Sequence, residues 1–185
     1  SLWLGVFGSW GLGWLDTQMP AIVWCGASSV FVALMFTSLK KASTREYWVA
    51  GIIFAALAAI PIYVLQKSLV PVGAEVQPRY ILPLLILLAA VVLVAFTGEE
   101  IKLSRVQAGV AAALLVIAQS IALYINLRRY VSGGHGGPIL DLSPEWWWTK
   151  PFGPMWVWAI GTLAFAVCVA AVFGRVIAMP SRVQV

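Results

Sequence analysis

The sequence predicts an all-α integral membrane protein. Three observations predict this class: the composition, the hydropathy and the length of the apolar segments. Of the 185 residues, 62% are hydrophobic and only 10% are charged, whereas soluble domains contain about 25% charged residues. The mean hydropathy is +0.93. The apolar segments are about twenty residues long and do not alternate with polar residues, which favours spanning helices over the strands of a membrane barrel.

The first eighteen residues are apolar but rich in glycine. The glycines are Gly5, Gly8, Gly11 and Gly13. Glycine at this density disfavours a spanning helix, so we expect the end of an upstream helix or an interfacial segment. Asp16 and Thr17 are expected to cap the first span, with Pro20 in its first turn, where a missing N–H costs little.

Five apolar segments follow, each long enough to cross a membrane. They are predicted at Pro20–Leu39, Tyr47–Leu65, Arg79–Thr97, Val106–Leu127 and Pro154–Phe173. Pro83 falls in the first turns of the third segment, where proline is tolerated, whereas Pro61 is expected to bend the second segment near its far end. The longest connection, residues 128–153, is expected to be an extracytoplasmic loop.

The chain opens without Met and without a basic stretch ahead of its apolar start, so no signal peptide is expected. We therefore expect residues 1–185 to form a single transmembrane domain that is a fragment, or the ordered part, of a longer protein. Five spans place the two ends of such a chain on opposite sides of the membrane.

The distribution of basic residues predicts the orientation. One side holds Lys40, Lys41, Arg45, Lys102, Arg105, Arg175 and Arg182, and the other holds Lys67, Arg79, Arg128, Arg129 and Lys150. By the positive-inside rule, the side that holds the larger set is predicted to face the cytoplasm. We therefore predict an N-terminus outside, a C-terminus in the cytoplasm, and a multi-pass protein of the cytoplasmic (inner) membrane. All tryptophans except Trp48 fall on the predicted outer side.

Charge and cysteine content exclude several classes of function. The net charge of +5 is spread over the connections and forms no Lys/Arg-rich run, so it does not indicate nucleic-acid binding. Cys25 and Cys168 lie in apolar segments, where a disulfide would need their helices to pack together. Small buried residues are the simpler interpretation. The sequence has no Cys/His cluster, and we expect neither a metal nor another cofactor.

A fixed charge stands at the start of the third span. Downstream of Arg79, residues 81–97 contain no ionisable side chain. We expect Arg79 at a membrane surface, with Gln77, Pro78 and Tyr80 forming a rigid polar corner around it. A planar guanidinium suits two phosphate oxygens, so this corner is a candidate phosphate site. The alternative is an anchor for ordinary lipid headgroups.

A second candidate lies in the glycine-rich stretch before the first span. Trp10 and Trp14 are four residues apart, a spacing that suits stacking on a sugar ring or an isoprenoid chain. The alternative is an aromatic belt at the membrane interface. Asp16 is a candidate general base or metal ligand, with helix capping as the alternative.

Other polar residues are weaker candidates. His135, Asp141 and Glu145 share the long outer loop, but their spacing matches no pattern of metal ligands. The adjacent residues 146–148 are all tryptophan and are expected to fix this loop in the membrane interface.

The fourth span carries a further polar group, which consists of Gln119, Ser120 and Asn126. These side chains could be functional or could hydrogen-bond between helices. No ionisable residue lies in the middle of a span, which disfavours a proton-coupled transporter.

Three stretches resemble a bacterial family of predicted multi-pass membrane proteins of unknown function, commonly grouped with the GT-C glycosyltransferases. Residues 7–20, FGSWGLGWLDTQMP, are similar to the family's GSFGWLDTPLP. Residues 73–83, GAEVQPRYILP, are similar to its GVQGRYLLPLLP, and residues 127–130 are similar to its RYY. The resemblance covers about residues 5–132. Pro78 departs from the pattern, where Gly is usual, and the chain from Gly133 onward lies outside it.

The resemblance implies a membrane glycosyltransferase-like protein that uses a polyprenyl-phosphate sugar donor in cell-envelope polysaccharide assembly. It implies a donor-phosphate group and a facing substrate wall. The first consists of Arg79, Gln77 and Tyr80, and the second of Trp10, Trp14 and Asp16. The resemblance also implies that residues 1–185 are the C-terminal part of a longer protein. In GT-C enzymes the catalytic acidic residue usually lies in the first extracytoplasmic loop, near the N-terminus and outside this chain, so the catalytic residue and the activity of this chain stay open.

The alternative is a non-catalytic membrane subunit or scaffold of a larger complex. Small residues within the spans, which would let neighbouring helices approach closely, fit this alternative. The expected partners are therefore membrane lipid, a polyprenyl-phosphate sugar or the protein subunits of a membrane complex, and no nucleic acid.

Overall fold

The structure is a computed structural model that describes residues 2–10, 17–40, 42–69, 77–94, 103–133, 135–142, 144–148 and 151–178. Its elements are α1 (Leu2–Leu4), a short π-helical segment η1 (Gly5–Ser9), α2 (Ala21–Leu39), α3 (Thr44–Ser68), α4 (Pro78–Val94), α5 (Arg105–Ser132) and α6 (Pro154–Ala178). The described residues contain helices and no strand. The all-α prediction is confirmed.

Within the described ranges, four helices are long and apolar enough to cross a membrane: α2, α3, α5 and residues 154–174 of α6. The fifth, α4, has 17 residues. At a rise of 1.5 Å per residue it covers about 25 Å, a little less than the roughly 30 Å of a bilayer core. The predicted multi-pass membrane protein is confirmed. Lipid contact follows from it, because many large apolar side chains of these helices are exposed.

The boundary of α3 differs from the prediction. The helix begins at Thr44, three residues before the predicted start, because Ser43 and Glu46 form a capping box. The Ser43 N–H donates to the Glu46 carboxylate over 2.6 Å, and the Glu46 N–H donates to the Ser43 hydroxyl over 3.4 Å. These bonds satisfy N–H groups that the first turn of a helix leaves free.

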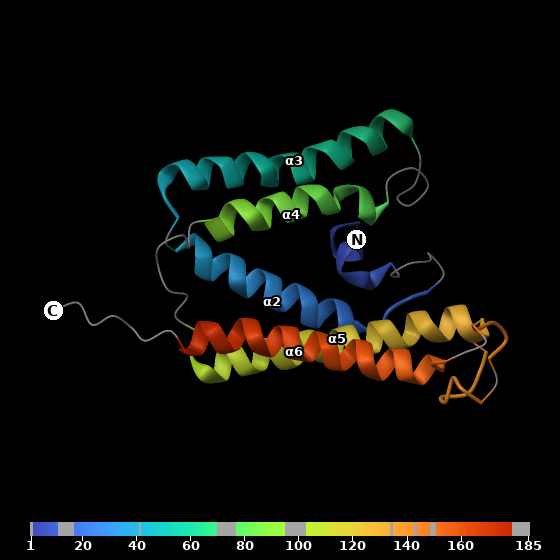
Figure 1. Ribbon diagram of the computed structural model, residues 1–185. Helices are drawn as coiled ribbons and strands as arrows, with labels where there is room; N and C mark the ends of the chain where they lie inside the picture. Colours follow the sequence, from blue (N-terminus) through green and yellow to red (C-terminus); the bar gives the residue numbers. More distant parts are fainter. Residues whose placement is uncertain are drawn as a thin grey trace.

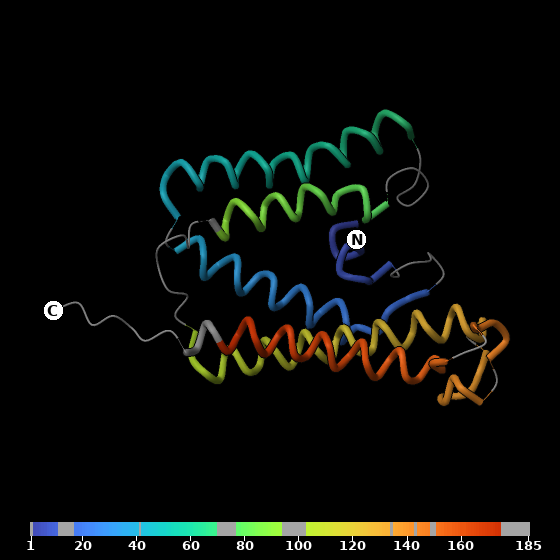
Figure 2. The backbone as a smooth tube through the Cα atoms, viewed as in Figure 1, coloured from blue at the N-terminus to red at the C-terminus, as the bar shows by residue number. Residues whose placement is uncertain are grey.

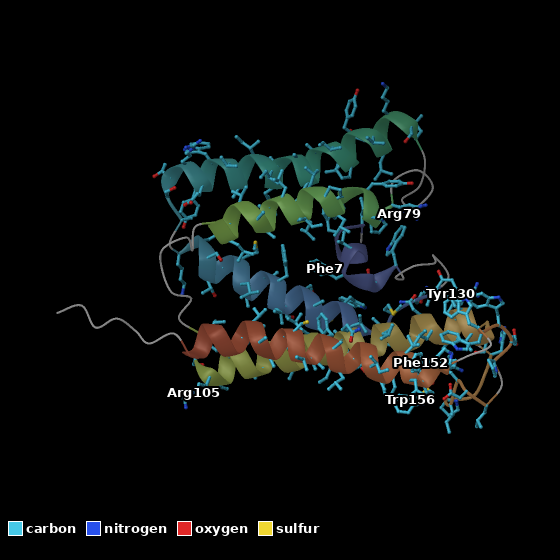
Figure 3. All side chains as sticks on the ribbon, in the orientation of Figure 1. Phe7, Arg79, Arg105, Tyr130, Phe152 and Trp156 are labelled. Atoms are coloured by element: carbon cyan, nitrogen blue, oxygen red, sulfur yellow. The ribbon has the colours of Figure 1, made fainter. Side chains whose placement is uncertain are left out.

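The helices lie side by side in the order α3, α4, α2, α5 and α6 (Figure 1). Each runs between the same two ends of the bundle (Figure 2). Figure 3 labels Arg79 at one end and Arg105 at the other, and we name the ends after them. Helices α2, α4 and α6 begin at the Arg79 end, and α3 and α5 end there. This matches the predicted division of the chain into two sides.

The N-terminal segment packs inside the bundle at the Arg79 end, between α2 and α4 (Figure 1). Leu2 is 3% exposed and belongs to the main apolar cluster. The Trp3 indole N–H donates to the Leu57 carbonyl of α3 over 2.9 Å. The Phe7 ring lies 5.5 Å from the Phe31 ring of α2. Its described residues form only two short helical segments, neither long enough to span a membrane, and Gly8 interrupts the second at a φ of 111°. This agrees with the prediction from the glycine content.

The predicted cap of α2 is wrong. The N-cap residue is Pro20, whose carbonyl accepts from the Val23 N–H over 3.0 Å. Thr17 lies ahead of the cap, and Asp16 lies outside the described residues. Proline suits this position because the N–H of a cap residue needs no helical partner. Pro20 therefore precedes the first turn of α2, whereas the sequence predicted that it lies within that turn.

Polar contacts join α5 to α6. The Trp158 indole N–H of α6 donates to the Ser120 carbonyl over 3.0 Å, and the Thr162 and Ser120 hydroxyls are 3.3 Å apart. Ser120 therefore has the interhelical role that was one of its two predicted alternatives. Cys25 and Cys168 are free thiols. Both are exposed, so the prediction that they are buried is wrong.

A close approach at Gly5 predicts the effect of adding a methyl group there. A Cβ on Gly5 would lie 2.3 Å from the Pro78 Cγ, whereas one on Gly51 would meet no atom within 4 Å. Gly5→Ala is therefore expected to lower the free energy of unfolding by about 1–3 kcal/mol, the cost of overpacking. Gly51→Ala should leave it unchanged or raise it. Unfolding in detergent micelles measures both, and equal effects would contradict the packing described here.

The predicted orientation can be tested by labelling with a membrane-impermeant maleimide. In a chain without Cys25 and Cys168, a cysteine at the exposed His135 should react on intact cells. A cysteine at the exposed Arg45, at the Arg105 end, should react only after permeabilisation. The reverse pattern would show that the Arg79 end faces the cytoplasm.

Candidate functional site

The candidate site is the Arg79 corner, which comprises Gln77, Pro78, Arg79 and Tyr80. Pro78 is the first residue of α4, a position that proline favours because its missing N–H would have no helical partner. The Tyr80 N–H donates to the Gln77 carbonyl over 3.0 Å and closes the first turn. Local sequence therefore holds Arg79 in the first turn of an apolar helix.

The Arg79 side chain is exposed and stacks beside Tyr80. Its guanidinium carbon lies 5.4 Å from the centre of the Tyr80 ring, which is a cation–π distance. Tyr80 is itself 56% exposed. Arg79 makes no hydrogen bond and no ion pair with any residue that the structure describes. None of its five N–H donors is used by a described residue, so they are available to an external acceptor.

The electrostatics of this corner favour an anion. The N-terminus of a helix carries a partial positive charge from its aligned peptide dipoles, and Arg79 adds a full charge at the same place. Gln77 stands at the edge of the corner and is half-buried. Its Oε1 atom is buried and has no hydrogen-bond partner among the described residues. A buried acceptor without a partner is uncommon in proteins.

The structure places Trp10 next to this corner. The Cβ position of Gly5 lies 2.3 Å from the Pro78 Cγ and 3.2 Å from the Trp10 Cγ, so Gly5 separates the two rings by its backbone alone. Trp10 is half-buried and follows η1. The other two residues of the predicted substrate wall, Trp14 and Asp16, lie outside the described residues. Four of the six predicted site residues therefore gather at one end of the bundle.

The long loop after α5 lies at the same end, and α5 holds it in place. The Arg128 guanidinium donates to the Gly136 carbonyl over 2.9 Å, and the Tyr124 hydroxyl donates to the Pro138 carbonyl over 2.8 Å. The Val131 carbonyl accepts from two N–H groups further along the loop, at 2.9 and 3.1 Å. The sequence did not predict that Arg128 and Tyr124 hold this loop. The basic residue in the last turns of α5 is a signal that could have indicated Arg128.

Asp141 caps α6 from this loop. Its Oδ1 atom accepts from the Met155 N–H over 3.1 Å. In the described ranges, His135, Asp141 and Glu145 do not come together as a group that could hold a metal ion. Asp141 thus has a structural partner that explains it without metal chemistry.

The three consecutive tryptophans form a cluster beside this cap. The Trp148 ring lies 5.0 Å from Trp147 and 5.3 Å from Trp146, both at steep angles. The Trp147 indole N–H donates to the Phe152 carbonyl over 2.7 Å. A hollow of about 550 Å³ opens between this cluster and the start of α6. Phe152 and Trp156 are seen at this end in Figure 3, together with Tyr130.

Comparison with known families gives one match. Residues 1–88 match the family described as predicted membrane protein (DUF2142). The matched range contains the N-terminal segment, α2, α3 and the Arg79 corner, and it ends within α4. No curated protein and no solved structure matches the chain. The family description supports a membrane protein and names no activity.

The cap on α6 predicts the effect of two changes at Asp141. Asp141→Ala removes the acceptor for the Met155 N–H and is expected to lower the free energy of unfolding by about 1 kcal/mol. Asp141→Asn keeps an oxygen in the same place and should cost less. Hydrogen exchange at the first turn of α6 checks both variants. The cap would have no role if exchange were the same in Asp141→Ala as in the unmodified chain.

Proposed function

We propose that the chain is the membrane domain of a GT-C-type glycosyltransferase-like protein of the cytoplasmic membrane. In this proposal the Arg79 corner binds the phosphate of a polyprenyl-phosphate sugar donor used in cell-envelope polysaccharide assembly. The observation that carries the proposal is the Arg79 guanidinium, which is exposed in the first turn of an apolar helix and has no hydrogen bond or ion pair with a described residue.

The surface of α4 below Arg79 supports an amphiphilic ligand. Leu82, Ile86 and Leu93 follow Arg79 at spacings of three, seven and fourteen residues, so all four share one face of the helix. These three apolar side chains are 40%, 59% and 40% exposed. A cation therefore stands above an exposed apolar stripe. A polyprenyl phosphate has the complementary order, with an anionic head above a hydrocarbon tail.

The chemistry assigns a role to the corner. In glycosyl transfer, the bond between the sugar C1 and the phosphate oxygen breaks while an acceptor hydroxyl bonds to C1. The departing phosphate gains negative charge, which a bidentate guanidinium and a helix N-terminus stabilise. The acceptor hydroxyl also needs a base to take its proton. We propose that this base lies in the first extracytoplasmic loop of the longer protein.

A non-catalytic subunit is the second candidate function. It is favoured by two apolar hollows on the sides of the bundle, both in the half nearer Arg105. One of about 370 Å³ lies between α2 and α5, and one of about 390 Å³ lies between α2, α3 and α4. Such hollows would accept a helix of a larger membrane complex.

Arg79 variants test the donor proposal. Farnesyl phosphate serves as a short polyprenyl phosphate, and native mass spectrometry of the protein in lipid nanodiscs measures its binding. Arg79→Ala should weaken binding about tenfold or more, since a hydrogen bond to a charged group contributes roughly 1.5–3 kcal/mol. Arg79→Lys should keep part of the affinity, because the positive charge remains. The rest should be lost, because lysine lacks the planar guanidinium that binds two phosphate oxygens at once.

Arg45→Ala is the matched control, because Arg45 is an exposed arginine in the first turn of α3, at the other end of the bundle. Farnesol is the control without a phosphate and should not distinguish the variants. Equal binding of farnesyl phosphate to Arg79→Ala and to the unmodified chain would reject the donor proposal. If Arg79→Ala instead weakened the binding of an anionic phospholipid as much as that of farnesyl phosphate, Arg79 would be an anchor for lipid headgroups. The subunit function would then be favoured.

A further inference from the structure

We propose that the hollow in the loop between α5 and α6 is a binding site for an uncharged saccharide. The hollow is lined by the aromatic residues Trp147, Trp148 and Phe152, by Asp141 and Glu145, and by three prolines and Gly153. It is separate from the Arg79 corner and uses none of its residues. The inference goes beyond the proposed donor site and does not rest on it.

The aromatic side chains offer a stacking platform. Trp148 is 66% exposed, although the centres of the Trp147 and Trp146 rings lie 5.0 and 5.3 Å from the centre of its own ring. Trp147 is half-buried, and the bond from its indole N–H to the Phe152 carbonyl holds it in place. A sugar ring has an apolar face of C–H groups, and that face packs well against an indole. Large, rigid aromatic side chains give contact area at little cost in conformational entropy.

The carboxylates select the charge of the ligand. Glu145 is exposed, and its carboxylate makes no hydrogen bond or ion pair with a described residue. Ionised carboxylates only accept hydrogen bonds, so they match the hydroxyl donors of a sugar. Among the described residues that line the hollow, the charged ones are Asp141 and Glu145, and none is Lys or Arg. An anionic headgroup would therefore meet repulsion here, whereas an uncharged saccharide would not.

The backbone holds this hollow in shape before any ligand arrives. The N–H groups of Glu145 and Trp146 both donate to the Val131 carbonyl at the end of α5. At the other side, Asp141 is bonded to α6, and a Cβ on Gly153 would lie 2.5 Å from the Asp141 Oδ1. A site that is already ordered loses less entropy on binding. The volume of about 550 Å³ lies in the range of small-ligand sites, about 300–1,000 Å³.

The experiment measures saccharide binding by the full chain in lipid nanodiscs. The probes are N-acetylchitobiose, cellobiose, maltose and lactose, observed by saturation-transfer NMR and titration calorimetry. At least one probe should bind with a Kd of about 1 mM or lower. Trp148→Ala should weaken that binding about tenfold, the effect of losing one aromatic stacking contact. Trp148→Phe should retain part of it, and Glu145→Gln should weaken it by a smaller factor.

Trp156→Ala is the matched control, because Trp156 is an exposed tryptophan of α6 that does not line the hollow. It should bind the probes as the unmodified chain does. The proposal fails if none of the four probes binds, or if Trp156→Ala weakens binding as much as Trp148→Ala. It also fails if brominated lipids quench the fluorescence of Trp148, measured as the difference between the unmodified chain and Trp148→Ala. The Trp148 side chain would then lie in the bilayer as an anchor. Unchanged unfolding temperatures ensure that folded variants are compared.

Discussion

The rest of the structure depends on one constraint: in a bilayer, each backbone N–H and C=O must find its partner inside the protein. Regular helices meet this constraint along their length, so the backbone can depart from helical geometry only where the helices end or where protein surrounds it, as it does at Gly8. The two ends of the bundle meet the constraint differently. At the Arg105 end, α3 and α5 begin with capping boxes built on Ser43 and Ser104. At the Arg79 end, α2, α4 and α6 begin at or directly after a proline: Pro20, Pro78 and Pro154. A proline start needs one donor fewer to be satisfied. At this end Asp141 still caps α6, whereas Arg79 and Gln77 beside the start of α4 make no side-chain hydrogen bond with a described residue.

Close packing then joins separate parts of the sequence at the Arg79 end. Gly5 has no side chain, so the N-terminal segment can approach Pro78 and Trp10 within contact distance. Leu2 anchors the same segment in the main apolar cluster, and the Trp3 indole anchors it to α3. Arg79 follows Pro78 directly, so the position of its backbone is set by this packing. The charge of the corner comes from the sequence, but the packing around Gly5 fixes its place beside Trp10.

The sequence predicted the elements well and their contacts poorly. Hydropathy over twenty residues is a strong signal, so a helix is found close to the position of each of the five predicted spans, and four of these helices are long enough to cross a membrane. The start of α3 was missed because a capping box, which is local, extends the helix beyond its apolar part. Contacts over longer distances leave no such trace: Tyr124 bonds across to Pro138, and Asp141 caps a helix that begins thirteen residues later. Cys25 was expected to be buried because it is apolar. In lipid, however, apolar residues face outward as readily as inward, so hydrophobicity does not predict burial there.

The proposed sites differ in charge, although both lie at the Arg79 end. The Arg79 corner presents a cation and a helix N-terminus, whereas the described residues that line the loop hollow present carboxylates and aromatic rings. Because the two sites carry opposite charges, they favour different ligands: placing like charges next to each other costs free energy. A phosphate-bearing lipid would therefore be directed to α4, and an uncharged saccharide to the loop before α6. An enzyme that moves a sugar from a lipid phosphate to an uncharged acceptor needs this separation, because its two substrates must not compete for one site. A scaffold subunit has no such need. The separation of charge at one end of the bundle is thus an argument for the transferase proposal that does not depend on the family resemblance.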